Sequence, residues 1–317
     1  MTTIISRQLI LDELLLVEAA VTADNSLAVC AWMQRSYEDD ETISKILYCN
    51  NDLWVDGPFI PWEATSICIS PEGHPVVLGR EGHVVTIKNN TLVKLPEVGG
   101  PEAIGPFRKI KTLNNQLYVL GEDHGVYHFN TQKWQKLPNG FPSADLDSFS
   151  SHDDFLDKIV SCVDILFDIA SLPTGKLCAT GTSGEIWVHD SNKWRREHPP
   201  TNMNLFSAVA DEIGNAFYIG GQNGTLLHGS DDYWDLITTP GIAEDFISLA
   251  VAPEALYIAT GQSAIKYTED GFKRISYEEQ IIPAHFALAN SNIRVMLARK
   301  EVFISTDLGN NWRSLLS

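Results

Sequence analysis

Positive charge is scarce in this sequence. The 317 residues include 23 lysines and arginines against 41 aspartates and glutamates, which gives a formal net charge of −18 at pH 7 and an isoelectric point near 4.8. Nucleic acids and anionic membranes repel an acidic surface, so the charge argues against both as partners. A basic protein would be attracted instead.

Long apolar runs and paired cysteines are also lacking. No run approaches the ~18 apolar residues of a transmembrane helix. The apolar stretch at 2–17 is interrupted by Asp12 and Glu13, and it has no basic region or small-residue cleavage site of a signal peptide. The cysteines are odd in number and form no CxxC pair, so we expect reduced, buried thiols and a cytoplasmic, monomeric protein. They are Cys30, Cys49, Cys68, Cys162 and Cys178.

One turn sequence is echoed along the whole chain. Residues 305–312 read S-T-D-L-G-N-N-W, after the β-rich run Val302-Phe303-Ile304. Asp307 and Gly309 are turn residues, so this stretch predicts a hairpin whose second strand starts at Trp312. An aromatic or aliphatic residue opens a short run after a turn at six earlier positions, and the successive gaps are 38, 42, 60, 40, 38 and 40 residues. These anchors are Trp54, Leu92, Trp134, Trp194, Trp234, Phe272 and Trp312.

Five of those gaps match the ~40–45 residue period of a propeller blade. The sequence therefore predicts an all-β fold, a seven-bladed β-propeller of four-stranded antiparallel blades, as a single domain over 1–317. The expected blades span about 14–59, 63–98, 106–140, 159–199, 205–239, 245–278 and 284–317, with a long inter-blade insertion at 139–158. We expect residues 3–6 to add an edge strand. Six or eight blades stay open if Leu92 or Trp54 is not an anchor.

The turn at 305–312 matches S-x-D-x-G-x-x-W and resembles the Asp-box, or BNR, repeats of sialidase-like and photosystem-assembly-factor-like β-propellers. The pattern is complete only here, with shortened copies at 268–272 and 230–234. In those families the Ser and Asp side chains bond the turn backbone, and the aromatic residue lies between neighbouring sheets. The resemblance therefore implies an architectural and not a catalytic role for Ser305, Asp307 and Trp312.

The same resemblance raises an alternative function, a sialidase-like glycoside hydrolase or a carbohydrate-binding propeller. Enzymes of that type use three arginines around the axis, a Tyr–Glu pair and an acidic Asp. Here Arg195, Arg274 and Arg313 follow outer-strand anchors, and Tyr277 and Glu278 are adjacent in sequence only. We therefore predict that the protein is not an enzyme and has no catalytic residues.

Candidate ligands for metals and cofactors are weakly patterned. The glycine-rich turns lack the Lys-Ser/Thr tail of a phosphate loop. The insertion gathers Asp145, Asp147, His152, Asp153 and Asp154, without the glycine of an EF-hand or the spacing of HExxH, so a solvated acidic loop explains it better. We predict no metal and no cofactor. The acids expected on inner strands either line a central channel or form a buried polar ladder around the axis: Glu18, Asp164 and Asp168.

Acidic residues gather in two sets of connections that a propeller brings to one face. These are the loops between the second and third strands of a blade and the connections between blades. Loops on a rigid scaffold are where binding resides, so we predict that this face binds a basic protein, with Trp62 as an exposed anchor. The predicted partner-binding residues are Glu38, Asp39, Asp40, Trp62, Glu63, Glu81, Glu122, Asp123, Asp145, Asp147, Asp153, Asp154, Glu244 and Asp245.

Solubility alone is the open alternative for these carboxylates. The function that we predict is a non-enzymatic, protein-binding propeller. The narrower hypothesis is a bacterial immunity protein that neutralises a basic toxin such as a nuclease, with carboxylates taking the place of substrate phosphates.

Overall fold

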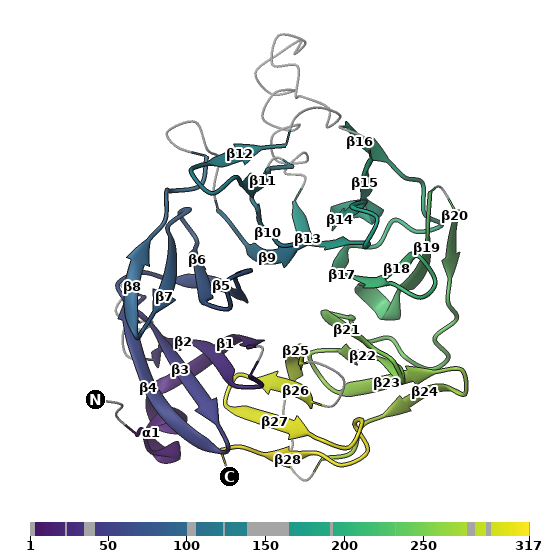
Figure 1. Ribbon diagram of the computed structural model, residues 1–317. Helices are drawn as coiled ribbons and strands as arrows, with labels where there is room; N and C mark the ends of the chain where they lie inside the picture. Colours follow the sequence, from purple (N-terminus) through teal and green to yellow (C-terminus); the bar gives the residue numbers. More distant parts are fainter. Residues whose placement is uncertain are drawn as a thin grey trace, which may run out of the picture.

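The fold is a ring of seven sheets around a central channel (Figure 1). The computed structural model describes residues 4–22, 24–34, 42–99, 106–122, 124–137, 165–190, 193–231, 233–277, 283–289 and 293–316. Each sheet has four antiparallel strands that are consecutive in the chain. The predicted fold class, a seven-bladed β-propeller, is confirmed. Among the described residues, no helix has the length and hydrophobicity needed to cross a bilayer.

The blades are numbered in chain order, and the first strand of each lies at the channel. Blades 1 to 3 contain β1 (Leu14–Val21), β2 (Leu27–Met33), β3 (Ser44–Asn50), β4 (Leu53–Ile60); β5 (Ala64–Ile69), β6 (Pro75–Gly79), β7 (Val84–Lys88), β8 (Thr91–Lys94); and β9 (Lys109–Leu113), β10 (Gln116–Leu120), β11 (Val126–Phe129), β12 (Trp134–Lys136). Blades 4 and 5 contain β13 (Leu166–Ser171), β14 (Leu177–Gly181), β15 (Ile186–Asp190), β16 (Lys193–Arg196); and β17 (Leu205–Asp211), β18 (Ala216–Gly221), β19 (Leu226–Ser230), β20 (Tyr233–Leu236). Blades 6 and 7 contain β21 (Ser248–Ala252), β22 (Ala255–Ala259), β23 (Ala264–Thr268), β24 (Gly271–Arg274); and β25 (Pro283–Ala289), β26 (Ile293–Ala298), β27 (Glu301–Ser305), β28 (Arg313–Ser314).

Asparagine pairs close several of the tight hairpins. Asn89 and Asn90 have φ of 51° and 61°, and Asn114 and Asn115 have φ of 48° and 60°. Two successive residues at positive φ form the type I′ turn, whose twist matches that of the strands on either side. Asparagine tolerates this conformation better than other residues with a side chain, which is why the sequence turns here.

The ring closes without a blade shared by the two ends of the chain. Blade 1 holds only the first four strands and blade 7 only the last four. At this junction the Trp54 indole donates to the Leu315 carbonyl at 3.0 Å, and the Leu16 amide donates to the Arg299 carbonyl at 2.8 Å. The N- and C-termini lie beside blade 1 and blade 7 (Figure 1). Packing, a side-chain hydrogen bond and a backbone hydrogen bond therefore hold the seam.

The N-terminal segment differs from the expected edge strand. Ile4 makes one antiparallel bridge with Val55 of β4, and the chain then forms α1 (Arg7–Glu13), which the sequence analysis did not predict. Ser6 caps this helix, since its hydroxyl accepts from the Leu9 amide at 3.2 Å. Ile10 of α1 is buried in the core that joins blades 1 and 7.

The anchors pack between blades. Trp54, Trp134, Trp194 and Trp234 are at most 7% exposed, while Leu92, Phe272 and Trp312 are half-buried. The Trp312 ring lies 6.2 Å from Tyr257 of blade 6 and 5.9 Å from Phe286 of blade 7, between centroids.

The turn before Trp312 has the hydrogen bonds that the pattern implies. The Ser305 hydroxyl accepts from the Gly309 amide at 3.0 Å, and the Asp307 carboxylate accepts from the Asn311 amide at 2.9 Å. Gly309 has a φ of 73°, and a Cβ there would lie 2.2 Å from the Tyr257 hydroxyl. Glycine is therefore required on grounds of both conformation and space.

Four of the cysteines lie in the described part of the chain. Cys30, Cys49, Cys68 and Cys178 are free and buried, whereas Cys162 lies outside the described residues. Burial raises the pKa of Cys49 to about 11 and that of Cys68 to about 12. These thiols therefore stay protonated and serve as small apolar side chains.

Candidate functional site

Seven polar residues, one from each blade, surround the channel at equivalent positions of the inner strands. In five blades a β-bulge directly precedes the residue and turns it toward the axis. All but Lys109 and His285 are less than 9% exposed. We call this set the axial belt: Glu18, Ser66, Lys109, Asp168, Ser207, Ser248 and His285.

The axial belt joins each blade to the next. Five belt side chains accept a hydrogen bond from the next blade. In each case the donor is the backbone amide of the residue directly after the belt residue of that blade. The acceptor and donor pairs are Glu18 with Ile67 at 2.9 Å, Ser66 with Ile110 at 3.2 Å, Asp168 with Ala208 at 3.0 Å, Ser207 with Leu249 at 3.1 Å, and Ser248 with Phe286 at 3.2 Å. Lys109 cannot accept, and at that junction Asp168 itself accepts from the Ile169 amide at 2.9 Å.

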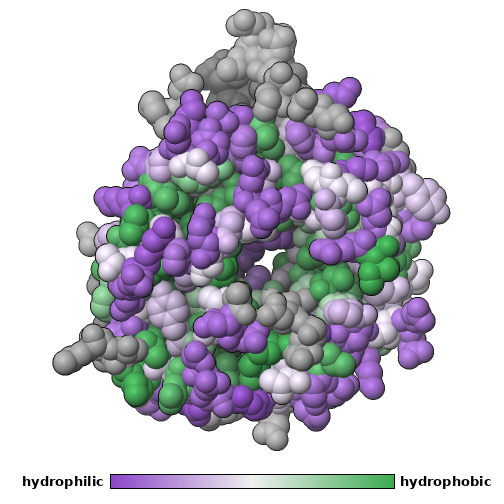
Figure 2. All heavy atoms as spheres, in the orientation of Figure 1, coloured by the Kyte–Doolittle hydropathy of each residue, from purple (hydrophilic) through white to green (hydrophobic). Residues whose placement is uncertain are grey.

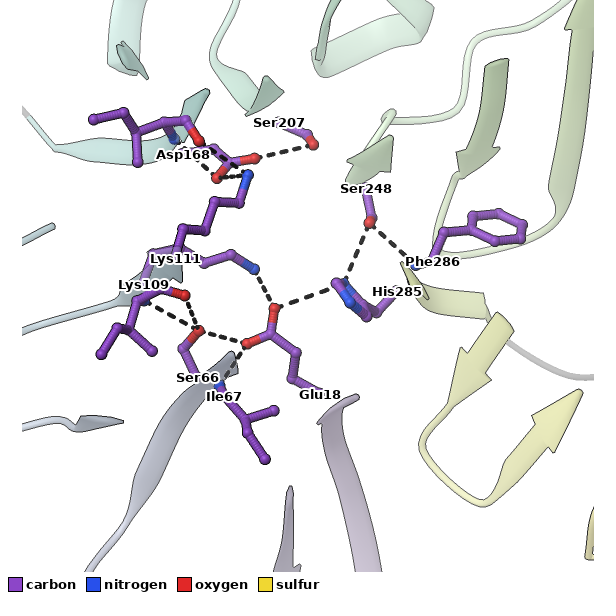
Figure 3. Close-up of polar contacts among 12 residues, drawn as sticks. Glu18, Ser66, Ile67, Lys109, Lys111, Asp168, Ser207, Ser248, His285 and Phe286 are labelled. Carbon is purple, nitrogen blue, oxygen red and sulfur yellow. Dashed lines mark hydrogen bonds and ion pairs between the residues drawn. The ribbon is translucent and has the colours of Figure 1, made fainter. Parts of the chain in front are cut away.

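Opposite charges in the channel are paired with one another (Figure 3). Lys109 forms an ion pair with Glu18, and the Lys111 ammonium lies 2.6 Å from the Asp168 carboxylate. Lys111 also donates to the Ile169 and Ala208 carbonyls at 3.1 and 3.3 Å. The four charges therefore cancel.

Burial is the largest single influence on Glu18 and would by itself raise its pKa. The charge of Lys109, together with the other contacts of this carboxylate, among them hydrogen bonds from Lys109 and Ser66, outweighs burial and lowers the pKa to about 2. The ring of His285 lies 3.7 Å from the Glu18 carboxylate, and burial lowers the pKa of His285 to about 4. At neutral pH the belt thus contains an ionised Glu18 and an uncharged His285.

The contacts of the axial belt show what the acids of the inner strands do. Glu18 and Asp168 line the channel and also take part in a polar ladder, so the two alternatives from the sequence hold together, while Asp164 lies outside the described residues. Glycoside hydrolysis needs a carboxylic acid whose pKa is raised so that it can protonate the leaving group. The pKa of Glu18 is lowered instead, and Arg108 is the arginine that lines the channel among the described residues.

Two cavities of the channel meet at the belt. One cavity of about 680 Å³ runs from the residues just before the belt past it to Lys111 and Ala210, and another of about 830 Å³ extends farther along the inner strands beyond the belt. Figure 2 shows the channel as an opening with hydrophilic atoms near the centre of the ring. Within the described ranges, no group of three His, Cys, Asp or Glu side chains is placed to hold a metal ion. The acidic cluster at 145–154 lies outside them.

The two sets of connections expected on one face do meet there. The Arg80 amide in the β6–β7 loop donates to the Glu63 carbonyl at 3.2 Å, and the Gly224 amide in the β18–β19 loop donates to the Glu244 carbonyl at 2.8 Å. Glu63 and Glu244 belong to connections between blades. We call this side of the ring the connection face.

The predicted carboxylates in the described part of this face are mostly engaged within the fold. Arginines pair with Glu63 (Arg80, 3.9 Å), Glu122 (Arg108, 3.1 Å) and Glu244 (Arg274, 2.5 Å). Arg274 holds the pKa of Glu244 at about 2. Asp245 accepts from the Asn223 amide at 2.9 Å, and Glu81 is exposed. The other predicted acids lie outside the described residues: Glu38, Asp39, Asp40, Asp123, Asp145, Asp147, Asp153 and Asp154.

Trp62 is half-buried, whereas an exposed side chain was expected from the sequence. Its ring stacks on His83, with centroids 5.8 Å apart and an interplanar angle of 20°. A Cβ on Gly79 would lie 2.7 Å from this ring. The indole therefore covers the start of the β6–β7 loop, which is a packing role.

Six residues of the channel were not predicted from the sequence: Lys109, Lys111, His285, Ser66, Ser207 and Ser248. The available signal was the run Lys109-Ile110-Lys111, in which charged residues alternate with an apolar one in the first strand of a blade. An inner strand faces the channel with alternate residues, so two lysines on one side indicate acids opposite them.

Comparison with known proteins gives one curated relative and many structural neighbours. No family model matches the chain. Immune protein Tsi7 of Pseudomonas aeruginosa is 26% identical over 265 residues, which are 81% of this chain and 81% of that protein. A structure of YCF48 bound to D1 peptide superposes with a TM-score of 0.67 at 12% identity, covering 96% of this chain and 94% of that one. YCF48 from Cyanidioschyzon merolae gives 0.65 at 11% identity, with 94% and 97% coverage. These structures share the propeller fold.

Proposed function

We propose that this protein is a non-enzymatic immunity protein, which binds and neutralises a basic protein toxin in the cytoplasm. The observation that carries the proposal is the 26% identity to immune protein Tsi7 over 81% of both chains. Similarity over this share of both chains favours a shared way of binding over a shared fold alone. Structural neighbours that include a propeller bound to a peptide support a protein-binding role.

The charge distribution supports a basic partner. Segments 35–41 and 138–164 account for eight of the eighteen net negative charges, since four acids stand against Arg35 in the first and six against Lys158 in the second. These segments connect β2 to β3 and β12 to β13, and connections of both kinds meet at the connection face. The acids of this face that pair with arginines stabilise the fold, so we assign toxin attraction to the two acidic segments.

A nuclease is the toxin class that this chemistry fits best. A nuclease groove is basic because it binds phosphates, and carboxylates can occupy the same positions. Reduced, buried cysteines suit a cytoplasmic site of action.

Co-expression tests the proposal. Basic proteins captured on the tagged chain from its source cells at low salt are each expressed alone and together with the chain. We expect one of them to stop growth alone and to be harmless in the presence of the chain, and purified chain should inhibit its nuclease activity at an equimolar ratio. If none of the captured proteins is toxic, or if the chain gives no protection, the proposal is wrong.

A further inference from the structure

We propose that the channel opening on the connection face receives a short loop of the basic partner, with an aliphatic or aromatic side chain inserted toward the axial belt. This inference rests on the proposed function. In this proposal the channel opening, and not Trp62, supplies the apolar centre of the interface.

A second ring of residues forms the entrance. The residue directly before each axial-belt position lines the 680 Å³ cavity. The inner strands of blades 2 to 7 start where a connection between blades ends. The start of β1 bonds the β26–β27 loop through the Leu16 amide and the Arg299 carbonyl, so the residues before the belt lie nearer the connection face than the belt does. We call them the mouth ring: Val17, Thr65, Arg108, Phe167, Phe206, Ile247 and Ala284.

The mouth ring has an apolar arc and a polar arc. Its five apolar members come from blades 4 to 7 and blade 1, which are adjacent around the ring, whereas Thr65 and Arg108 come from blades 2 and 3. Phe167 and Phe206 are half-buried, and their rings meet edge to face with centroids 5.3 Å apart. An entrance with two unlike sides fits a peptide loop, whose side chain can face the apolar arc while its backbone faces the polar arc.

The floor of the cavity favours an uncharged side chain. Glu212 also lines the cavity, but it lies beyond the belt, in the β17–β18 turn. At the belt itself, Glu18 is bonded to Lys109, and Lys111 is bonded to Asp168 and to two carbonyl groups, so neither sign of charge is in excess there. A charged group entering here would lose its hydration and gain no free counter-charge. A volume of 680 Å³ is within the ~300–1,000 Å³ of ligand pockets and exceeds one side chain, which points to a loop of a few residues.

Trp62 and most of the acids described on the connection face are already engaged within the fold, which favours the mouth ring as the site of the apolar anchor. Trp62 is occupied with His83, and arginines hold Glu63, Glu122 and Glu244. Protein interfaces concentrate binding energy in a desolvated apolar centre within a polar rim. The acidic sequence of segments 35–41 and 138–164 complements lysines and arginines on either side of the inserted loop.

Two variants test the mouth ring against the toxin identified by co-expression. Phe206→Ala removes part of the apolar arc, and Ala284→Trp fills the entrance without removing a contact. The matched control is Phe272→Ala, a half-buried phenylalanine on the outer strand β24. Binding kinetics on captured toxin should show dissociation at least ~10-fold faster for both mouth variants, the scale of an interface anchor, and unchanged for the control.

The outcomes separate the inference from the function. If the parent neutralises the toxin and Ala284→Trp dissociates at the parental rate, the inference is overturned, whatever Phe206→Ala does through a loosened fold. A dimer of the parent that Ala284→Trp abolishes would assign the mouth to a second copy of this chain and would also overturn it. If the parent neutralises no basic toxin, the proposed function itself fails.

Discussion

At the scale of single residues, five side chains of the axial belt tie an inner strand to the next one by accepting a hydrogen bond from a backbone amide. Ser207 shows the arrangement in its simplest form, since its hydroxyl donates to Asp168 at 3.2 Å and accepts from the Leu249 amide at 3.1 Å. Ser207 is 4% exposed, so water could not replace its hydroxyl as the acceptor for the Leu249 amide if the hydroxyl were removed.

We expect Ser207→Ala to lower the free energy of unfolding by about 1–3 kcal/mol, the penalty for a buried donor without an acceptor. The exposed Ser276→Ala is the control and should change it by less than ~0.5 kcal/mol. Urea unfolding followed by tryptophan fluorescence measures both. Equal stability of the two variants would show that the belt does not hold the blades together.

His285 gives the stability a pH dependence. Burial lowers its pKa from 6.5 to about 4, so between these values the unfolded chain binds a proton that the folded protein does not. The free energy of unfolding therefore falls as the pH drops from 6.5 to 4, by roughly 1–3 kcal/mol for this group. The contribution of Glu18, whose pKa is lowered from 4.5 to about 2, is lost at more acidic pH, between pH 4.5 and 2.

His285→Gln should reduce the loss of stability between pH 7 and pH 4.5, because glutamine does not titrate. His198→Gln, a change at an exposed histidine, serves as the control and should leave the parental pH profile in place. Urea unfolding at several pH values measures the slope. A parental slope in His285→Gln would contradict the assignment.

At the scale of elements, the sequence predicts features that neighbouring residues encode, and it does not predict features that depend on contacts between distant parts of the chain. Short β-rich runs with asparagine turns between them gave the strands, because their propensity and turn chemistry are carried by neighbouring residues. Helix α1 was missed because only its cap, Ser6, and seven residues signal it. The Glu244–Arg274 pair joins residues 30 positions apart, and the belt depends on the register of seven strands, so neither has a local pattern.

The seam between blades 1 and 7 is the element-scale feature most open to test. Trp54 is 2% exposed and donates to Leu315, whose own amide bonds the Val302 carbonyl at 2.8 Å. We expect Trp54→Ala to cost about 3–5 kcal/mol and to speed amide exchange in residues 313–316. Trp194→Ala, at the equivalent place in blade 4, should cost as much without that local exchange. Slow exchange at the seam in Trp54→Ala would mean that other contacts close the ring.

At the scale of the whole molecule, a rigid ring carries acidic residues that are unevenly distributed along the sequence. The ring is held by its own bonds, among them arginine pairs that neutralise acids of the connection face. Segments 35–41 and 138–164 together contain ten acidic residues and two basic ones. Net negative charge on these connections acts over long distances and speeds the encounter with a basic partner. Packing at the mouth ring sets how long the complex lasts.

The central claim is that these acids steer a basic toxin to the connection face, and the association rate across a salt series tests it most directly. Two quadruple variants are compared with the parent: lysines at Asp145, Asp147, Asp153 and Asp154, and, as a control of equal charge, lysines at the exposed Glu72, Asp235, Glu269 and Asp270 away from that face. We predict that the parental association rate falls as salt shortens the Debye length from ~30 Å at 0.01 M to ~8 Å at 0.15 M, that the first variant associates slowly at every salt concentration, and that the control stays near the parent. An association rate indifferent to salt, or an equal loss in both variants, would contradict the account and leave the carboxylates a role in solubility alone.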